Sequence, residues 1–335
     1  MISYPFSWTL VYCAAHQLVH WIGCKISASI RTCGSIQYTT AAAARLDFAK
    51  KKRRSSLTRA PIAAHHRLTA MEPPPLAPSP LDLARADLTL LKTQSVAERR
   101  ALAADACRDI DPWTSAMHVV VGCSEAFTIR ALCRDDAALM VAFARTGLSA
   151  KSRELFAPFD WMGTDEALAM EFGASIINST TRTDLHLIAL VGGGDAAGSA
   201  AVVVAHAFLW SVAGAIPELG IAVADEWHGR GLGSSLLLVL EAHAREMNKA
   251  ALELTTMTSN ETAFNAYVAA GYELLGMIRN PVGVDVTAAF RGDVVATRFC
   301  DERQMVLVLD EARREETLTA LAEKRVEAAE MFGGS

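Results

Sequence analysis

Residues 218–240 read ELGIAVADEWHGRGLGSSLLLVL, and this stretch decides how the rest of the chain is interpreted. Its first part, Glu218–Ala224, is expected to form a strand. A glycine-rich loop follows, and from Ser234 to about Met247 leucines recur on one face, which predicts a helix. Glycines before a helix let an anion approach the backbone N–H groups at its positive end. The stretch therefore predicts a site for a phosphate or pyrophosphate group.

Strands and helices are expected on both sides of this stretch. Downstream, Ala251–Thr255 predicts a strand, and Asn260 is expected to cap a helix that ends at Gly271. The other expected strands are 127–132, 185–191, 200–209, 272–275 and 305–309, and the other expected helices are 81–106, 137–145, 165–172 and 310–331. This alternation predicts a mixed α/β domain.

Two motifs flank the expected strand at 251–255. They are His228-x-x-Gly231-x-Gly233 and Asn260-x-x-Ala263-x-x-x-Tyr267-x-x-x-Gly271-Tyr272. In this order they resemble the motifs of the GNAT N-acetyltransferase superfamily, although that family usually has Gln or Arg where this chain has His228. The resemblance covers about residues 126–309. It implies an α/β (α+β) GNAT fold, with a twisted, mainly antiparallel sheet flanked by helices and a V-shaped splay that holds CoA.

The resemblance also implies acetyl-CoA as co-substrate, with no metal. The residues that would contact acetyl-CoA are Ile221, Ala222, Val223, His228, Gly229, Arg230, Gly231, Leu232, Gly233, Ser234 and Asn260. A competing prediction from the same loop is dinucleotide binding, because Gly229-x-Gly231-x-x-Ser234 is close to a dinucleotide fingerprint and Glu253 follows about 20 residues later.

Acetyl transfer to an amine needs a base, because a lysine amine with a pKa of about 10.4 is almost wholly protonated at neutral pH. Glu218 begins the strand where members of the family often place this base, and an alternating strand puts Glu218, Gly220 and Ala222 on one face. Tyr267 matches the family tyrosine that protonates the departing thiolate. The structural alternatives are a strand-end carboxylate for Glu218 and a half-buried helix residue for Tyr267.

The expected acceptor is a primary amine. Leu148-Ser149-x-x-Ser152-Arg153 resembles a segment of the branch that includes bacterial protein lysine acetyltransferases, although the aromatic residue and arginine that usually follow are absent. A protein lysine and a small-molecule amine both stay open as acceptors. A catalytically silent acetyl-CoA-binding module is a further alternative, and so is an interaction protein that works through its basic leader.

Charge and cysteine patterns limit the partners. Residues 1–71 hold ten Lys or Arg and one acid, whereas the rest of the chain holds 22 bases and 36 acids. The acidic body makes nucleic acid an unlikely partner, since phosphate contacts need clustered bases. Seven cysteines without a C-x-x-C spacing indicate reduced thiols, with no zinc site and no disulfide framework. We expect a cytoplasmic protein without a membrane span, and the sequence sets no oligomeric state.

The composition predicts four segments. Residues 1–71 are a basic leader expected to be disordered, or they precede the true start at Met71. Residues 72–125 form a Pro-rich linker and a helical segment. Residues 126–309 form the acetyltransferase domain, and 310–335 form a charged C-terminal helix.

Overall fold

The structure is a computed structural model that describes residues 84–91, 93–121, 125–156, 158–159, 161, 163–192, 200–282 and 298–332. All of these residues belong to one of the two compact units of the chain, the one that contains Pro78–Ser335. The leader predicted over 1–71 and the start predicted at Met71 lie outside the described residues.

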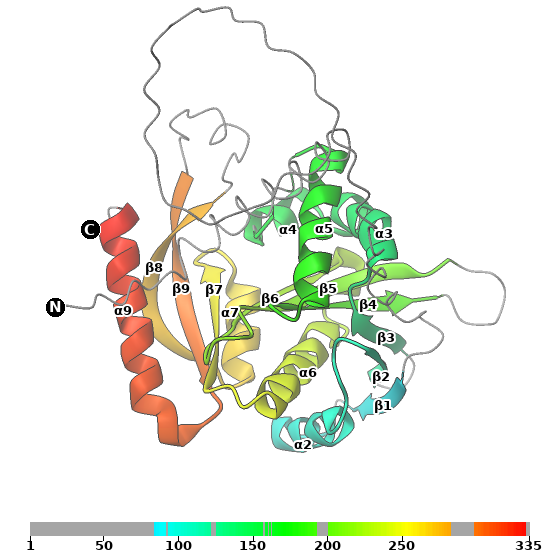
Figure 1. The fold of residues 1–335 in the computed structure, drawn as a ribbon, viewed down its shortest axis with the longest axis horizontal. Helices are drawn as coiled ribbons and strands as arrows, with labels where there is room; N and C mark the ends of the chain where they lie inside the picture. The colour runs from blue at the N-terminus through cyan, green and yellow to red at the C-terminus, as the bar shows by residue number, and fades with distance from the viewer. Residues whose placement is uncertain are drawn as a thin grey trace, which may run out of the picture. The chain divides into compact units, whose positions relative to one another are not determined.

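Nine strands form one open, mixed sheet in the order β1-β2-β3-β4-β5-β6-β7-β9-β8 (Figure 1). The strands are β1 Ala84–Leu90, β2 Ser115–Val121, β3 Glu125–Ala131, β4 Leu185–Val191, β5 Val202–Trp210, β6 Glu218–Val223, β7 Ala251–Met257, β8 Glu273–Val282 and β9 Arg298–Val308. Among these neighbours only β1–β2 and β6–β7 are parallel, so the expectation of a mainly antiparallel sheet is confirmed.

Helices cover both faces of this sheet, as Figure 1 shows. One face carries α2 Val96–Cys107, α6 Leu232–Glu246 and α7 Glu261–Ala269. The opposite face carries α3 Ala137–Ala142, α4 Ala150–Leu155 and α5 Asp165–Thr180 over β4, β5 and β6, and α9 Arg314–Phe332 beside β8 and β9. Short turns of 3-10 or π helix lie at Arg134–Asp136, Phe143–Gly147, Asp225–Trp227 and Glu311–Arg313.

The pattern of burial along β6 shows toward which face of the sheet each side chain points. Leu219 of β6 lies in the core under α6, whereas Ala222 lies in the core under α3 and α5. A Cβ at Gly220 would meet the ring of Phe208, which belongs to the second core. The prediction that Gly220 and Ala222 share a face is therefore confirmed, and the period of two places Glu218 on the same face.

The helix predicted over 81–106 is wrong in its first part. The described residues 84–90 form strand β1, which pairs in parallel with β2, and the helix begins only at Val96. Leu88 and Leu90 are buried while Asp87 and Thr89 are exposed, which is the alternation of a strand. Ser95 and Glu98 form a capping box at the start of α2. The sheet thus extends to the N-terminal side of the domain boundary predicted at 126.

Strand β2 was not predicted. Two predicted helices differ from the structure in extent. The helix α5 continues to Thr180, beyond the expected end at residue 172. The segment expected to be helical over 137–145 divides into α3 and a π-helical turn at Phe143–Gly147. Each of the remaining predicted strands and helices overlaps an element of the structure.

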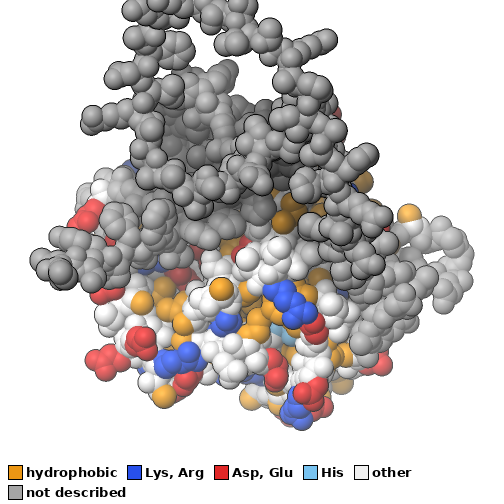
Figure 2. All heavy atoms as spheres, viewed as in Figure 1, with side chains coloured by type: hydrophobic (Ala, Val, Ile, Leu, Met, Phe, Trp, Pro, Cys, Tyr) orange, Lys and Arg blue, Asp and Glu red, His pale blue; other side chains and the backbone are white. Residues whose placement is uncertain are grey.

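The surface of the described residues carries charges of both signs. On the face shown in Figure 2, acidic and basic side chains of the described residues lie interspersed. In the described part of the chain, no helix is long and apolar enough to cross a bilayer.

Candidate active site

The parallel neighbours β6 and β7 separate along almost their whole length. Both strands are fully described, and their only register pair is Glu218 with Glu253. On its other side β6 pairs with β5 over six positions, and β7 pairs with β9 over seven. The predicted V-shaped splay is therefore present, with its apex at Glu218 and its open end at Val223.

The glycine loop lies at the open end of this splay. Gly229 and Gly231 have φ of +72° and +93°, which L side chains rarely adopt. Gly231 is the N-cap of α6 and has no side-chain capping bond among the described residues. Because the N–H of Ser235 makes the first bond back to the Gly231 carbonyl, the N–H groups of 232–234 lie at the positive end of the helix. This arrangement suits an anion.

The side chains of the loop hold it to the end of β6. The Nε2 atom of His228 lies 2.9 Å from the carbonyl oxygen of Val223. The guanidinium of Arg230 lies 4.7 Å from the ring centre of Trp227, which packs edge-on against Phe127. One ring nitrogen of His228 thus contacts the backbone of β6. The contact of His228 with acetyl-CoA stays a prediction.

A short helix of the opposite layer is joined to the same loop. Ser149 caps α4 by accepting a bond from the N–H of Ser152, and the Ser152 hydroxyl donates to Asp225 at 2.7 Å. Burial would raise the pKa of Asp225, but hydrogen bonds from the two serines lower it. The Nη1 group of Arg153 donates to the carbonyl of Ala144. These serines and this arginine therefore have structural roles of their own.

The apex of the splay holds two carboxylates and a lysine. The Nζ atom of Lys324, from α9, lies 3.4 Å from Glu218 Oε2 and 2.8 Å from Glu253 Oε2. The second oxygen of Glu253 accepts a bond from Gln304, whose own oxygen accepts one from Arg325. Partial burial raises the pKa of Glu218, the charge of Lys324 opposes this, and Glu253 raises it again.

Tyr267 and Asn260 lie on α7. The Tyr267 side chain packs on the core under α6, and burial raises its pKa to about 12, which keeps the phenol protonated. Its ring centre lies 5.7 Å from that of Tyr272. Asn260 caps α7, because its Oδ1 accepts a bond from the N–H of Ala263. Glu218 and Tyr267 thus lie on opposite faces of the sheet.

The family comparison agrees with this geometry. Residues 153–272 match the model of the acetyltransferase (GNAT) family, and this range contains both motifs, the glycine loop and the splayed strands. These residues form a GNAT acetyltransferase domain. The match lies inside the predicted range of 126–309, and the outer limits of the domain stay a prediction. No curated protein sequence matches the chain.

Solved structures similar to the chain include several acetyltransferases. A GNAT-family acetyltransferase from Streptococcus pneumoniae is 21% identical, with 55% of this chain and 99% of that one covered and a TM-score of 0.39. The GNAT domain of PAT from S. lividans is 17% identical, with 59% and 97% covered and a TM-score of 0.39. A ribosomal-protein-S5-alanine acetyltransferase from Vibrio fischeri is 10% identical, with 57% and 98% covered and a TM-score of 0.44. At these TM-scores the likenesses carry no argument about the acceptor.

The competing prediction of dinucleotide binding requires Glu253 to bind a ribose at the glycine loop, and the structure does not place it there. Glu253 has a side chain that is only 3% exposed, and both of its oxygens accept bonds, from Gln304 and Lys324. It faces α9, whereas the glycine loop begins α6 on the other face. Glu253 is therefore not placed to bind a ribose at that loop.

Sequence reasoning missed Lys324, Gln304 and Arg325. Lys324 lies 106 residues from Glu218 in the chain, and the charged helix that carries it has no motif. A lysine among many charged residues of a surface helix gives no signal for such a contact.

No metal centre is formed by the residues that the structure describes, since no three His, Cys, Asp or Glu side chains gather in a suitable cluster.

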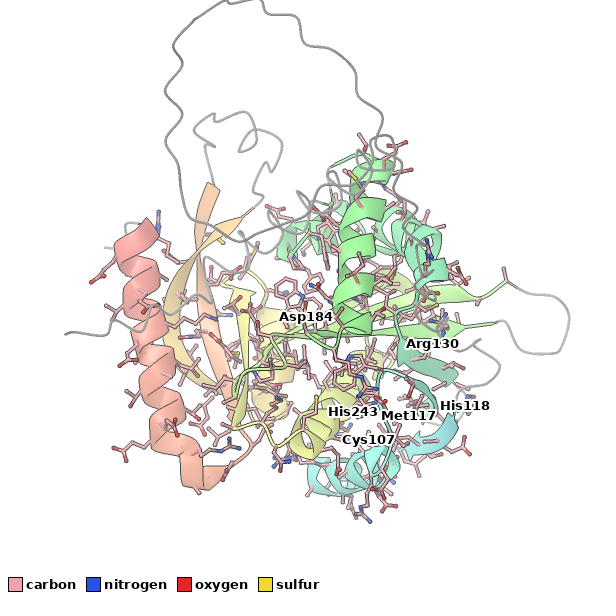
Figure 3. All side chains as sticks on the ribbon, viewed as in Figure 1. Cys107, Met117, His118, Arg130, Asp184 and His243 are labelled. Carbon is pink, nitrogen blue, oxygen red and sulfur yellow. The ribbon has the colours of Figure 1, made fainter. Side chains whose placement is uncertain are left out.

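Figure 3 shows Cys107 and His243 in the layer of α2 and α6. Cys107 is buried, and burial raises the pKa of its thiol to about 12.

Proposed function

We propose that the chain transfers an acetyl group from acetyl-CoA to a primary amine by direct attack, without an acyl-enzyme. One observation carries the proposal. An uncapped, glycine-rich helix start and a carboxylate stand at the two ends of a single splay between parallel strands.

Acetyl-CoA fits the splay as an extended ligand. Its pyrophosphate would accept bonds from the N–H groups of Leu232, Gly233 and Ser234 at the start of α6. From Val223 to Glu218 the strand spans about 17 Å, at about 3.3 Å per residue, and the extended pantetheine arm can cover this distance. The β7-facing edge of Ile221–Val223 has no strand partner and offers it backbone hydrogen bonds, apart from the Val223 carbonyl, which His228 contacts. The thioester then lies near Glu218.

The reaction needs a proton acceptor and a proton donor. Glu218 takes a proton from the acceptor ammonium, and the amine nitrogen attacks the thioester carbonyl carbon. The C–S bond breaks as the tetrahedral intermediate collapses, the thiolate takes a proton from Tyr267, and the second proton lost by the nitrogen restores the phenol. A raised pKa suits Glu218 to accept a proton, and a phenol with a pKa of about 12 is protonated when the thiolate leaves. The buried Cys107 thiol is unsuited to a covalent route.

The acceptor class stays open within this proposal. The segment that resembles the protein lysine acetyltransferases has its serines and arginine in local hydrogen bonds, so these residues do not favour a protein acceptor. We propose a primary amine, on a protein lysine or on a small molecule. A cytoplasmic location belongs to the proposal as well, and rests on the scattered cysteines of the sequence.

Thermal unfolding of the full chain with acetyl-CoA, CoA or NAD tests the cofactor. A ligand at 100 times its Kd stabilises by about 2.7 kcal/mol, which raises Tm by about 5–10 °C in a domain of this size. We expect this rise with both CoA species and none with NAD. A rise with NAD alone, or with none of the three, would contradict the proposal.

Ser234 offers a matched pair of variants for the same experiment. It is exposed in the first turn of α6. Ser234→Glu places a negative charge where the pyrophosphate would bind, while an acidic residue in a first helical turn does not harm folding. Ser234→Gln has the same size without the charge. We expect the Tm rise to be lost in Ser234→Glu and mostly kept in Ser234→Gln.

Release of CoA in the presence of a polyamine or a lysine peptide then separates an enzyme from a silent binding module. For an enzyme we expect release that falls about 100-fold or more in Glu218→Gln, the usual size of a general-base effect. A chain that binds acetyl-CoA and releases no CoA with any amine would be the silent module.

A further inference from the structure

The C-terminal helix α9 places a lysine amine at the proposed base. Lys324 is the residue of α9 that reaches the apex of the splay, and its side chain is 17% exposed. Leu321, one turn earlier, is buried against Ala251 and Val306, so the helix is anchored beside β7 and β9. Lys324 is therefore held in place by packing as well as by charge.

The position of this amine is the position that an acceptor amine needs. A general base acts on a proton within hydrogen-bond reach, directly or through one water. Lys324 Nζ lies 3.4 Å from Glu218 Oε2, beside the only register pair of β6 and β7. Glu253 holds the same nitrogen at 2.8 Å, which fixes it at the end of the path that the pantetheine arm would follow.

We propose that Lys324 is an intramolecular acetyl acceptor of this domain, an inference that rests on the proposed function. Glu218 takes a proton from the Lys324 ammonium, and Nζ attacks the carbonyl carbon of acetyl-CoA. An N–C bond forms, the C–S bond breaks, and the CoA thiolate takes up a proton. The product is a neutral acetyl-lysine, so the ion pairs of Lys324 with Glu218 and Glu253 are lost.

Two other lysines serve as references for the rate of uncatalysed acetylation. Lys151 is exposed on α4 and meets acetyl-CoA in solution without hindrance. Lys249 donates to the carbonyl of Val212, and burial followed by the charge of Arg313 lowers the pKa of its amine, so more of it is neutral. Spontaneous chemistry therefore favours Lys151 and Lys249, whereas the proposal favours Lys324, whose amine is paired with two carboxylates.

The test is peptide mass spectrometry of the full chain after timed incubation with acetyl-CoA, at several protein concentrations. We expect acetyl-Lys324 to form with a rate constant that does not depend on protein concentration. We expect the rate to exceed those at Lys151 and Lys249, and to fall about 100-fold in Glu218→Gln, the usual size of a general-base effect. Ser234→Glu should also suppress it, because acetyl-CoA no longer binds.

Lys324→Arg is the folding control, because it keeps a cation at the carboxylates and removes the acceptor. A Tm rise with acetyl-CoA, together with acetylation at Lys324 no faster than at Lys151, would overturn this inference and leave the proposed function standing. A rate that grows with protein concentration would overturn the intramolecular route. Loss of both the Tm rise and the acetylation would overturn the proposed function, and this inference with it.

Discussion

Mild acid is predicted to destabilise the fold through three buried histidines. The Nδ1 atom of His186, on β4, lies 3.1 Å from Nε2 of His206, on β5, and the two rings stack with centres 5.3 Å apart. Neither side chain is exposed, and among the described residues the outer nitrogen of each has no partner. His243 on α6 is buried in a similar way. A proton added at His186 Nε2, His206 Nδ1 or His243 Nδ1 would lack both water and a hydrogen-bond acceptor among the described residues.

Burial lowers the pKa of His206 to about 3 and that of His243 to about 4, the latter against an opposing effect of Asp111. For His186, burial followed by the neighbouring His206 lowers the pKa well below 6.5. Because the folded pKa is lowered, the unfolded chain takes up protons first as pH falls below about 6.5, and the free energy of unfolding decreases.

The size of this effect follows from the pH interval. From 6.5 down to pH 5, each neutral buried histidine costs about 2 kcal/mol, at about 1.36 kcal/mol per pH unit. The three together cost about 6 kcal/mol, which is a large part of a total stability of about 5–15 kcal/mol. Glu218 acts in the opposite direction, because its folded pKa is raised and the folded state therefore holds its proton more tightly. The net loss is somewhat smaller.

Urea unfolding of the full chain at pH 8, 6.5 and 5 measures this loss. The double variant His186→Leu/His206→Leu removes both partners of the pair, so it should keep most of its stability at pH 8 and lose about 4 kcal/mol less between pH 8 and pH 5. His118 is exposed on β2, and His118→Gln is the control that should follow the parent chain. If the parent chain lost less than about 2 kcal/mol over the interval, the argument from burial would be refuted.

Three further predictions concern two glycines and a buried ion pair. Gly220→Ala would place a Cβ 2.1 Å from Cζ of Phe208 and should cost about 1–3 kcal/mol in urea unfolding. Gly173→Ala on α5 has no described atom within 4 Å and should instead stabilise by about 0.5–1 kcal/mol. Asp136→Asn breaks a two-bond ion pair with Arg130, at 2.6 and 2.7 Å, and should cost about 3–5 kcal/mol by the same measurement. A loss below 1 kcal/mol would show that the pair is solvated.

The loop and the strands around it were predictable because their signals are local. Glycines at 229, 231 and 233 are adjacent in sequence to the strand and the helix that they join, and two of them take the left-handed conformation that favours glycine. β1 was not predicted, because Leu81, Leu83, Leu88, Leu90 and Leu91 permit either a helix or a strand when viewed alone. Parallel pairing with β2, which is a tertiary contact, decides between them.

The apex of the splay was predictable only in part. The prediction that Glu218 shares a face with Ala222 rests on the period of a strand, which is a local rule. Its partners Glu253, Gln304 and Lys324 come from three other elements, and no spacing rule joins them. The positions of Glu218 and Tyr267 on opposite faces likewise depend on how α7 packs, which the sequence of either segment does not state.

The splay itself has a physical explanation in the pairing of its two strands. β6 and β7 each have a complete partner on their outer side, and among the strand pairs of the described sheet theirs is the one held at a single position. Backbone groups left unpaired inside a protein are costly unless water or a ligand bonds to them. The amides of a pantetheine arm can supply those bonds along the splay. The proposed function thus has the ligand take the place of the missing ladder, with its thioester at the lysine and carboxylates beside the single paired position of β6 and β7.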